Sequence, residues 1–435
     1  MDMTASGVKQ APSLAPLGIL AGGGGLPEQI ADSAITRGRP VHIVAIEGEA
    51  GPGVARFPHT WVNWGGIGRM SASLRSAGCR DLIIVGSVTR PNPRRVRPDL
   101  GLIKAIPTII RLLGGGDDHV LRNVVRFFEA QGFDVKGVAD VAPELLVASG
   151  TLGRIAPAPT VAADASRAFA LIDALGFADA GQGVVIRDGR ILAVEAAEGT
   201  DRMLARLDQV PAACGAILVK RPKPDQELRV DMPVIGPRTV QLAAKMGLAG
   251  IVVEAGRVLV AERAQVIAEA DRSGLFVTGL ETQPGRRSAR ASQAFSLANR
   301  VMPHKRVQRD IALAAAAMTV LAEFATSAGI VVVRGHVIAV ETGEGIEAMF
   351  DRVKTLRQWG ATARSKRRGA IAVSASGIEA DGIDAIVAHA AEAGLAGIVL
   401  PGATGHDAAN RAGPIAEALG LSVGESKGEW RGRAR

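Results

Sequence analysis

The stretch Leu17-Gly18-Ile19-Leu20-Ala21-Gly22-Gly23-Gly24-Gly25 decides the fold class of this chain. Its apolar half predicts a buried strand that ends in four consecutive glycines. A helical segment, 28–37, and a second apolar strand, 41–46, follow. This order is typical of a parallel α/β sheet, in which bare N–H groups at the helix start can hold a phosphate. We therefore predict a Rossmann-like α/β domain over 17–155 that handles a nucleotide or phosphate, with a binding turn formed by Gly22, Gly23, Gly24 and Gly25.

A dinucleotide site is one interpretation of this turn. The G-x-G-x-x-G pattern fails, however, because Pro27 stands where the third glycine should allow close helix packing. Glu47 ends the second strand, where an acidic residue could bind a ribose. A purely structural tight turn explains the glycines about equally well. The sequence alone leaves both interpretations open.

Strands and helices continue to alternate up to about residue 130. Helix 70–77 and strand 81–86 lead to a cluster of arginines at positions 90, 94, 95 and 97. Guanidinium groups just past a strand suit a diphosphate, although a solvated basic loop explains them nearly as well. Asp117 and Asp118 then open a further helix, where capping is favoured over metal binding.

Composition narrows the class of protein. With 435 residues, 47% of them apolar, the chain is long enough for two to three domains. Cys79 and Cys214 are too few for a disulfide framework, which fits a reducing cytoplasm. Residues 1–16 lack an apolar core of signal-peptide length, and the run 311–322 is too short to span a bilayer. We therefore expect a soluble, cytoplasmic protein.

The positive net charge of the chain indicates that anionic partners should be considered. A net charge of +8 and a pI near 10.0 suit nucleic acid or an anionic membrane surface. Aromatic residues make up only 3% of the chain and tyrosine is absent, so base-stacking platforms are not expected. The basic clusters at 90–97, 286–306 and 427–435 are explained about as well by solvated loops and a tail. We expect no nucleic-acid partner and leave peripheral contact with an anionic membrane surface open.

A second α/β domain is predicted over 156–280. A stretch rich in glycine, proline and threonine, 150–159, marks the boundary, and a helix, 162–175, precedes a hairpin with an Asp188-Gly189 turn. Glu198-Gly199-Thr200-Asp201 then starts the next helix. Its Thr and Asp either cap that helix or face the charged loop that follows.

The segment 218–236 has the character of a reactive centre. An apolar strand, 216–219, is followed by a stretch that contains several prolines. This stretch carries the charged residues Lys220, Arg221, Lys223, Asp225, Glu227, Arg229 and Asp231. Prolines and charges continue neither a helix nor a central strand, so a rigid loop at a strand end is predicted. Cations there could hold a phosphate while carboxylates hold a metal or activate water.

Several spaced motifs occur together between Leu17 and Leu280. They are the strand and turn 17–27, Gly86-Ser87-Val88 with Arg90-Pro91, Gly116-Asp117-Asp118, Pro143-Glu144-Leu145-Leu146, Gly181-Gln182, Glu195 with Glu198-Gly199-Thr200-Asp201, and Lys220 through Gly236. In this combination the chain resembles the UDP-2,3-diacylglucosamine pyrophosphatases of the LpxI type. Two departures are mild: Gly183 stands where that family tends to have alanine, and Glu227 where it tends to have aspartate.

The resemblance implies a cytoplasmic, homodimeric, Mg²⁺-dependent enzyme of lipid A biosynthesis. In that family water attacks the α-phosphate of UDP-2,3-diacylglucosamine to give UMP and 2,3-diacylglucosamine 1-phosphate, lipid X, and the acyl chains lie between two domains. Carried over to this sequence, Asp231 is the key carboxylate, as a metal ligand or a base. Asp201 and Glu198 are further metal candidates, with helix capping as the alternative. Phosphate contacts and positioning fall to the glycine turn and to Arg90, Gln182, Thr200, Lys220, Lys223, Gln226 and Arg229.

The chain beyond residue 305 repeats part of the second domain. The run 329–341 parallels 183–195 without a gap, and 394–399 echoes 247–252. Nothing in the later copy matches Lys220 or Asp231-Met232-Pro233. We expect a degenerate, non-catalytic repeat over 306–424 that either fills the role of a dimer partner's domain or regulates access. A disordered tail (1–16), a basic linker (281–305) and a basic tail (425–435) complete the predicted organisation.

Two other classes of protein remain as alternatives. A non-enzymatic nucleotide sensor would explain the glycine turns and arginines but would leave the carboxylate-rich loop without a role. A basic interaction protein would bind an anionic membrane or nucleic acid through the linker and the tail. An NAD-linked enzyme is disfavoured by Pro27.

Overall fold

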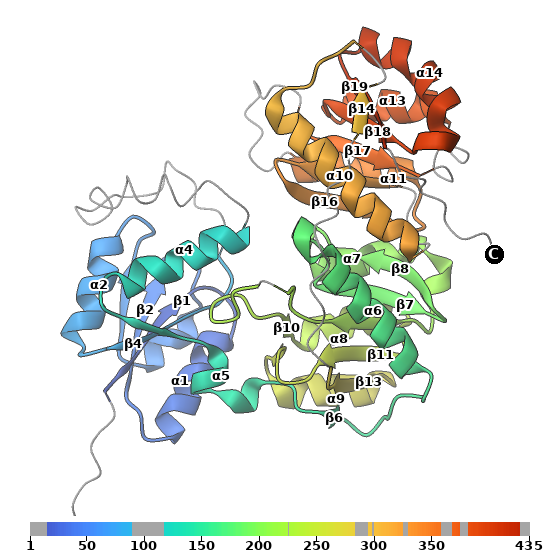
Figure 1. Cartoon of the computed structure of the whole chain (residues 1–435). Coiled ribbons are helices and arrows are strands. Elements are labelled where there is room, and N and C mark those ends of the chain that lie inside the picture. Colours follow the sequence, from blue (N-terminus) through green and yellow to red (C-terminus); the bar gives the residue numbers. More distant parts are fainter. Residues whose placement is uncertain are drawn as a thin grey trace, which may run out of the picture. The chain divides into compact units, whose positions relative to one another are not determined.

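The structure, a computed structural model, describes residues 15–88, 117–224, 226–282, 295–297, 300–324, 329–357, 368–374 and 382–426 (Figure 1). It divides the chain into two compact units. The first consists of Met1–Leu146 and Gln226–Met232, and the second of Val147–Asp225 and Pro233–Arg435. The charged loop predicted as one centre is therefore shared between the two units. Arg90 and Asp225 lie outside the described residues.

The first unit contains a parallel five-stranded sheet with the order β3-β2-β1-β4-β5. The strands are β1 (Leu17–Ala21), β2 (Val41–Ile46), β3 (His59–Val62), β4 (Asp81–Val85) and β5 (Asp134–Lys136). The helices are α1 (Leu26–Thr36), α2 (Ile67–Ser76), α4 (Asp117–Glu129) and α5 (Val138–Val141), with 3₁₀ turns η1 (Pro52–Arg56) and η2 (Pro143–Leu145). The order reverses between β1 and β4, so the turns after these strands lie where open α/β sheets bind ligands.

The segment 226–232 is anchored to this first unit by burial. Apolar side chains of the strands and of α4 form one cluster, which includes Leu20, Val44, Leu82, Val125 and Phe128. Val230 packs against the same cluster. Burial of an apolar side chain removes it from water and stabilises the segment at this position.

The second unit contains two six-stranded sheets with the same topology. Their orders are β6-β13-β11-β9-β7-β8, called here the second sheet, and β14-β19-β18-β17-β15-β16, the third sheet. The second sheet comprises β6 (Gly150–Thr151), β7 (Gly183–Arg187), β8 (Arg190–Val194), β9 (Ile217–Lys220), β11 (Gly250–Glu254) and β13 (Phe276–Leu280). The third comprises β14 (Phe295–Leu297), β15 (Gly329–Val333), β16 (His336–Glu341), β17 (Ala370–Val373), β18 (Gly397–Leu400) and β19 (Ser422–Ser426).

Strand directions agree position by position. In each sheet three central strands run parallel, a hairpin pairs antiparallel to one side, and a short antiparallel strand closes the other edge. Each hairpin carries a register shift at the same place, between Val185 and Ile186 and between Val331 and Val332. A small two-stranded ladder of β10 (Val234–Ile235) with β12 (Leu259–Val260) accompanies the second sheet.

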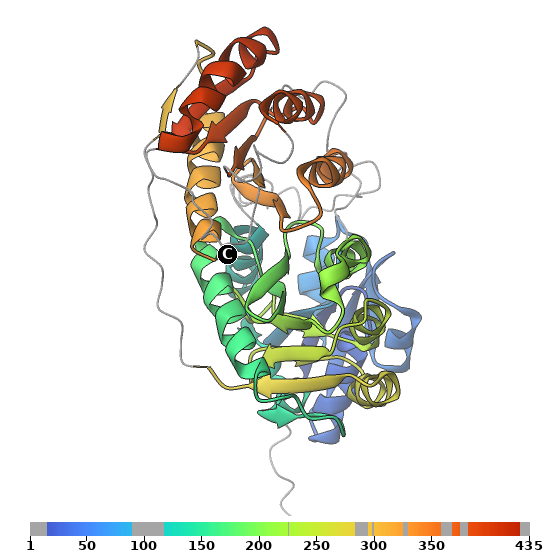
Figure 2. The same ribbon diagram turned by 90° about the vertical axis from the view of Figure 1, so that its right-hand side faces the viewer.

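Helices cover both faces of each sheet. The second sheet has α6 (Val161–Leu175) on one face and α7 (Thr200–Ala205), α8 (Pro237–Lys245) and α9 (Arg263–Ser273) on the other, as Figure 2 shows. Its connections contain the 3₁₀ turns η3 (Gly176–Ala178), η4 (Arg206–Gln209) and η5 (Pro211–Ala213). The third sheet has α10 (Lys305–Glu323) on one face and α11 (Ile346–Arg357), α13 (Ile383–Glu392) and α14 (Gly402–Ala418) on the other.

One helix carboxylate holds the hairpin turn in both sheets. Asp164 of α6 accepts the backbone N–H groups of Asp188 and Gly189 at 2.9 and 2.7 Å. Asp310 of α10 accepts those of Arg334 and Gly335 at 3.0 and 2.7 Å. Asp188 and Arg334 both have positive φ, which non-glycine residues seldom adopt, so these hydrogen bonds fix a strained turn.

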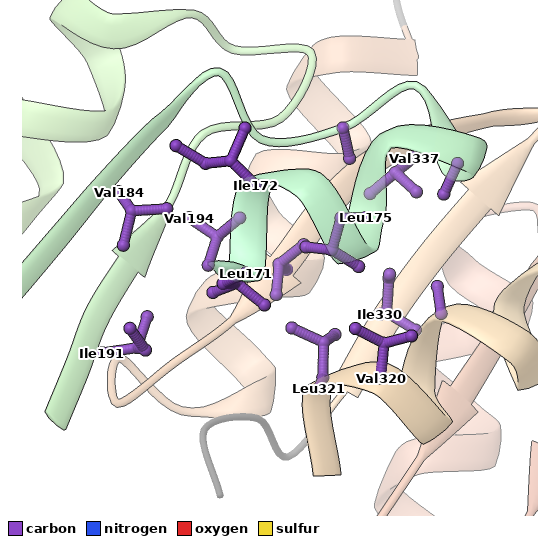
Figure 3. Close-up of a cluster of buried hydrophobic side chains, with 14 of the residues drawn as sticks. Leu171, Ile172, Leu175, Val184, Ile191, Val194, Val320, Leu321, Ile330 and Val337 are labelled. Carbon is purple, nitrogen blue, oxygen red and sulfur yellow. The ribbon is translucent and has the colours of Figure 1, made fainter. Parts of the chain in front are cut away.

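The two sheets share one hydrophobic cluster. Leu171 and Leu175 of α6 lie beside Val320 and Leu321 of α10, with side chains of both hairpins around them (Figure 3). Most members of this cluster are completely buried. The third sheet is therefore packed onto the second by a continuous apolar core.

Two of the expected domain boundaries differ in the structure. Gly150 and Thr151 pair with β13, so chain assigned to the first domain forms an edge of the second sheet. Phe295–Leu297, within the expected linker, pairs with β19 of the third sheet. Among the helices of the described ranges, none combines the length and the apolar character needed to cross a membrane.

Candidate active site

A buried relay of hydrogen bonds lies at the carboxyl end of β9. Lys220, the last residue of that strand, is 3% exposed, and its Nζ donates to Thr200 Oγ1 at 2.7 Å and to the carbonyl of Val234 at 3.3 Å. Thr200 Oγ1 donates to Glu195 Oε2 at 2.9 Å. Gln182 Nε2 approaches Glu195 Oε1 at 3.4 Å. The structure thus brings together three predicted residues, Gln182, Thr200 and Lys220, and adds Glu195.

Glu195 connects these groups because it is buried. Its side chain follows β8 and is 4% exposed, and a Cβ placed on Gly183 would stand 2.3 Å from Glu195 Oε2. The glycine therefore leaves the space that the carboxylate occupies. A buried carboxylate requires hydrogen-bond donors, which Thr200 and Gln182 supply.

A second buried cluster lies directly beside the relay. Arg221 donates to Asp173 at 3.0 Å and to Glu254 at 2.9 Å, and its guanidinium stands over the ring of Phe169. Glu254 also accepts from Arg257 and Thr282. Burial raises the pKa of Asp173, and the charge of Arg221 acts in the opposite direction. These paired charges hold the chain that follows β9 in one conformation.

Lys223 is held by a carboxylate rather than pointing to open solvent. Its Nζ forms an ion pair with Asp179, and Asp179 Oδ2 also lies 3.7 Å from His336 Nδ1 on β16. Burial alone would raise the pKa of Asp179, but the hydrogen bonds and charges of His336 and Lys223 outweigh it and lower that pKa to about 2. The phosphate contact assigned to Lys223 stays a prediction, because it requires this ion pair to open or to be shared.

In the first unit, the segment 226–232 presents Asp231. Gln226 Nε2 donates to Asp231 Oδ2 at 2.7 Å, and the Asp231 N–H donates to the carbonyl of Glu227 at 2.9 Å. Gln226 is 8% exposed, so it is a fixed donor. This hydrogen bond orients the carboxylate of Asp231, and the positioning role assigned to Gln226 stays a prediction.

Arg229 of the same segment pairs with carboxylates within the first unit. Its guanidinium donates to Glu227 at 2.8 and 2.9 Å and to Glu129 of α4 at 2.8 Å. These hydrogen bonds raise the pKa of Arg229 and lower that of Glu227. The structure therefore gives Arg229 a role in docking the segment on α4, while its predicted phosphate contact remains untested.

The glycine turn divides into a structural half and an open half. The N–H groups of Gly22 and Gly23 donate to the carbonyls of Val85 and Ser87 at 2.8 and 2.7 Å. A Cβ on Gly22 would lie 2.5 Å from the Ser87 carbonyl oxygen. Gly24, with φ of +89°, has open space around a Cβ position, and within the described ranges neither it nor Gly25 uses its N–H in a hydrogen bond. The phosphate contact predicted for the turn would therefore fall to its second half and to the start of α1.

The two further metal candidates have ionic partners. The side chain of Glu198 is 2% exposed and lies 3.5 Å from Arg206 and 3.2 Å from Arg352. Burial raises the pKa of Glu198, while the two arginines lower it. Asp201 is half-exposed and pairs with Arg238 at 2.6 Å. Within the part of the chain that the structure describes, no three His, Cys, Asp or Glu side chains gather as metal ligands. Both metal assignments stay predictions, and the pairing of Glu198 gives it a structural explanation.

Together these features define a two-unit α/β protein with polar groups at the carboxyl ends of its parallel strands and a glycine turn at a switch point. Residues 16–145 match the family model described as the LpxI N-terminal domain. Residues 148–278 and 296–401 match the model of the LpxI C-terminal domain. The chain belongs to the LpxI family.

A curated relative agrees with this assignment. The UDP-2,3-diacylglucosamine pyrophosphatase LpxI of Caulobacter vibrioides is 42% identical over 274 residues, which are 61% of this chain and 98% of that protein. The family and the α/β class predicted from sequence are thereby confirmed.

Proposed function

We propose that this chain hydrolyses the pyrophosphate bond of UDP-2,3-diacylglucosamine to UMP and 2,3-diacylglucosamine 1-phosphate, in lipid A biosynthesis, with Mg²⁺ and with water attacking the α-phosphate. The family and the name of the curated relative support the reaction. The observation that carries the proposal to this chain's own residues is the buried Lys220–Thr200–Glu195 relay at the end of β9. A cytoplasmic location, with the lipid substrate drawn from the inner membrane surface, follows from the substrate.

Lys220 would stabilise negative charge on the diphosphate. Its ammonium is fixed by Thr200 and by the Val234 carbonyl before substrate arrives. A charge held in a buried, preorganised position interacts with a developing negative charge more strongly than one in water. Glu195, one hydrogen bond further away, would limit how far Thr200 and Lys220 can turn.

Asp231 would act as the key carboxylate, either by holding Mg²⁺ or by accepting a proton from water. Mg²⁺ in phosphoryl-transfer sites commonly takes one or two carboxylates together with substrate phosphate oxygens. A lone carboxylate with one oxygen oriented by Gln226 fits that mode. The ion would neutralise phosphate charge when bound. Gln226 would keep the carboxylate directed at its target in either role.

The third sheet would carry no chemistry of this kind. By strand register, Val373 pairs with Gly329 as Lys220 pairs with Gly183. Ser374 follows where Arg221 follows β9, and Pro401 follows β18 where Glu254 ends β11. Glu341 remains but accepts the N–H groups of Gly343 and Gly345. We therefore propose that residues 306–424 are a duplicated, non-catalytic copy of the second domain.

The reaction can be tested directly. The purified chain, given UDP-2,3-diacylglucosamine and Mg²⁺ in ¹⁸O-labelled water, should release UMP that carries the label, because attack at the α-phosphate places the new oxygen on UMP. Label in the lipid phosphate instead would contradict the attack site. Nucleotide binding without any UMP release would contradict the enzyme and would favour a nucleotide sensor.

A further inference from the structure

Four charged residues, two of them buried and two partly buried, join the second and third sheets. Glu198 and Arg206 follow β8, and Glu344 and Arg352 follow β16 at equivalent positions. Between the sheets, Arg352 Nη1 lies 3.2 Å from Glu198 Oε1, and Arg206 Nη1 lies 3.5 Å from Glu344 Oε1. Within each sheet's own segment, Arg206 also pairs with Glu198 and Arg352 with Glu344. Two positive and two negative charges therefore compensate one another away from water.

These contacts have the pattern of a two-fold symmetric interface. Each interaction between the sheets has a counterpart in which the two partners exchange roles. The same holds for the backbone: Arg206 donates to the carbonyl of Val194 at 3.1 Å, and Arg352 donates to that of Val340 at 3.1 Å. Reciprocal contacts of this kind define the isologous interface of a symmetric dimer. Here both halves belong to one chain.

Apolar burial extends the same interface. Side chains of α6 and α10 and of both hairpins form the shared cluster seen in Figure 3. Large, continuous apolar contacts are typical of permanent subunit interfaces. The curated relative aligns over 98% of its length with only 61% of this chain, so a member of this family exists without a further segment of this size.

Two contacts break the symmetry and favour pairing within the chain. Thr342 Oγ1 donates to the carbonyl of Leu192 at 2.9 Å, and Ala196 stands at the position equivalent to Thr342. Arg167 donates to the carbonyl of Phe324 at 3.0 Å and lies over its ring, whereas Leu313 and Ala178 occupy the reciprocal positions. Two copies of the second sheet would lack the Thr342 hydroxyl, because alanine cannot donate this hydrogen bond, and would lack the Phe324 ring under Arg167. The interface therefore discriminates in favour of the third sheet.

We propose that residues 300–426 are a built-in partner subunit. They occupy the face of the second sheet that would otherwise bind a second copy of this chain, and they hold the chain as a monomer. Because Glu198 lies between Glu195 and Thr200 in sequence, Arg352 also acts as a positioning residue for the loop that carries the buried relay. The homodimer implied by the resemblance is thereby replaced by contacts within one molecule.

The first test measures mass, which does not depend on the proposed reaction. Light scattering of the full chain after size exclusion should give 44.9 kDa, one chain, throughout the micromolar range. A dimer in that range would overturn the proposal, because the face would then not have replaced association between chains.

The second test compares two substitutions on α11 by hydrogen exchange. Arg352→Met removes the contact with Glu198, whereas Lys354→Met removes a cation that pairs with Asp351 and Glu392 inside the third-sheet segment. Arg352→Met should lower protection of β8 and of residues 195–200 roughly tenfold, and Lys354→Met should leave both unchanged. Equal effects of the two variants, or no effect of Arg352→Met, would overturn the positioning role.

A milder variant guards against loss of the fold. Thr342→Val removes one hydroxyl that donates to the carbonyl of Leu192 and keeps the shape of the side chain. If Arg352→Met does not fold, Thr342→Val should still raise exchange in β8 while exchange in α13 stays unchanged. Unaltered exchange in β8 would count against the interface as proposed.

Discussion

The Nζ atom of Lys220 lies 2.7 Å from Oγ1 of Thr200, and both residues are held at the carboxyl end of β9 by burial and by Glu195. At the equivalent positions of the third sheet stand Val373 and Ile346, which cannot form this contact. The same sheet topology thus forms with and without the relay. The relay is not needed to build the fold, and this makes it the best target for separating activity from stability.

Replacing Lys220 with methionine should lower kcat about 100- to 1000-fold. The change removes the preorganised cation that we propose to stabilise the diphosphate, and losses of this size are typical when a donor to a developing negative charge is deleted. Lys220→Arg should not restore the rate, because a planar guanidinium cannot take the place of a compact buried ammonium. Steady-state UMP release gives the rates, and circular dichroism should show an intact fold, since the third sheet accepts valine at this position. Full activity of Lys220→Met would remove this residue from the mechanism.

Replacing Asp231 with asparagine should abolish turnover, with a loss of at least about 100-fold in kcat. Stability should change by at most about 0.5 kcal/mol, because the neutral amide keeps the shape and a contact with Gln226. If Asp231 is a metal ligand, the Mg²⁺ concentration needed for residual activity should rise. If it is the base, that concentration should stay constant while the residual rate loses its dependence on pH. Wild-type turnover would show that Asp231 is only a turn residue.

Gln226→Leu is the matched test of how Asp231 is oriented. It removes the donor 2.7 Å from Asp231 Oδ2 and leaves the carboxylate charged. We expect a fall in kcat of about tenfold with little change in KM, because a misdirected group weakens the transition state more than the bound substrate. A change in KM alone would place Gln226 in substrate binding instead.

The sequence predicted long apolar strands better than short strands that depend on pairing with their neighbours. β1 and β2 have the predicted bounds because each is a continuous apolar run next to glycine or charge. The short strands β3 and β5 lack such a run, since polar residues such as Thr60 and Asp134 interrupt them. Pairing with already formed neighbours, rather than their own pattern, makes them strands.

The candidate site was predictable in its residue types but not in their pairing. The sequence placed both Lys220 and Thr200 near the ends of strands. It did not predict that the two side chains would form a hydrogen bond with each other. Lys223 and Arg229 looked equally available for phosphate, yet each has a carboxylate partner that is distant in sequence, Asp179 and Glu129. Spacing along the chain carries no information about such long-range partners. The symmetric exchange of Glu198 and Glu344 between two arginines could be suspected only from the internal repeat.

The two halves of the glycine turn should respond differently to alanine. Gly22→Ala places a Cβ 2.5 Å from a backbone carbonyl oxygen, which cannot move aside without separating β1 from β4, so we expect a loss of about 2–3 kcal/mol. Gly24→Ala meets open space and costs only the strain of a positive φ, about 1 kcal/mol. Urea unfolding of the two variants measures the difference. Equal losses would mean that the close approach of the turns at Gly22 does not constrain the fold.

The contribution of Asp179 to the free energy of unfolding should depend on pH within a defined range. Its folded-state pKa of about 2 lies below the ordinary value of 3.8, so its contribution is fully present above the unfolded pKa and is lost as pH falls through the folded one. Asp179→Asn should therefore destabilise the chain by at most about 2 kcal/mol at neutral pH. The difference between wild type and variant should shrink as pH falls below about 4, where Asp179 begins to take up its proton in the unfolded chain. Denaturant unfolding at several pH values measures it, with Asp188→Asn, an exposed carboxylate on the neighbouring hairpin, as the control. A difference that did not shrink below about pH 4 would mean that the charges of Lys223 and His336 do not hold Asp179 ionised.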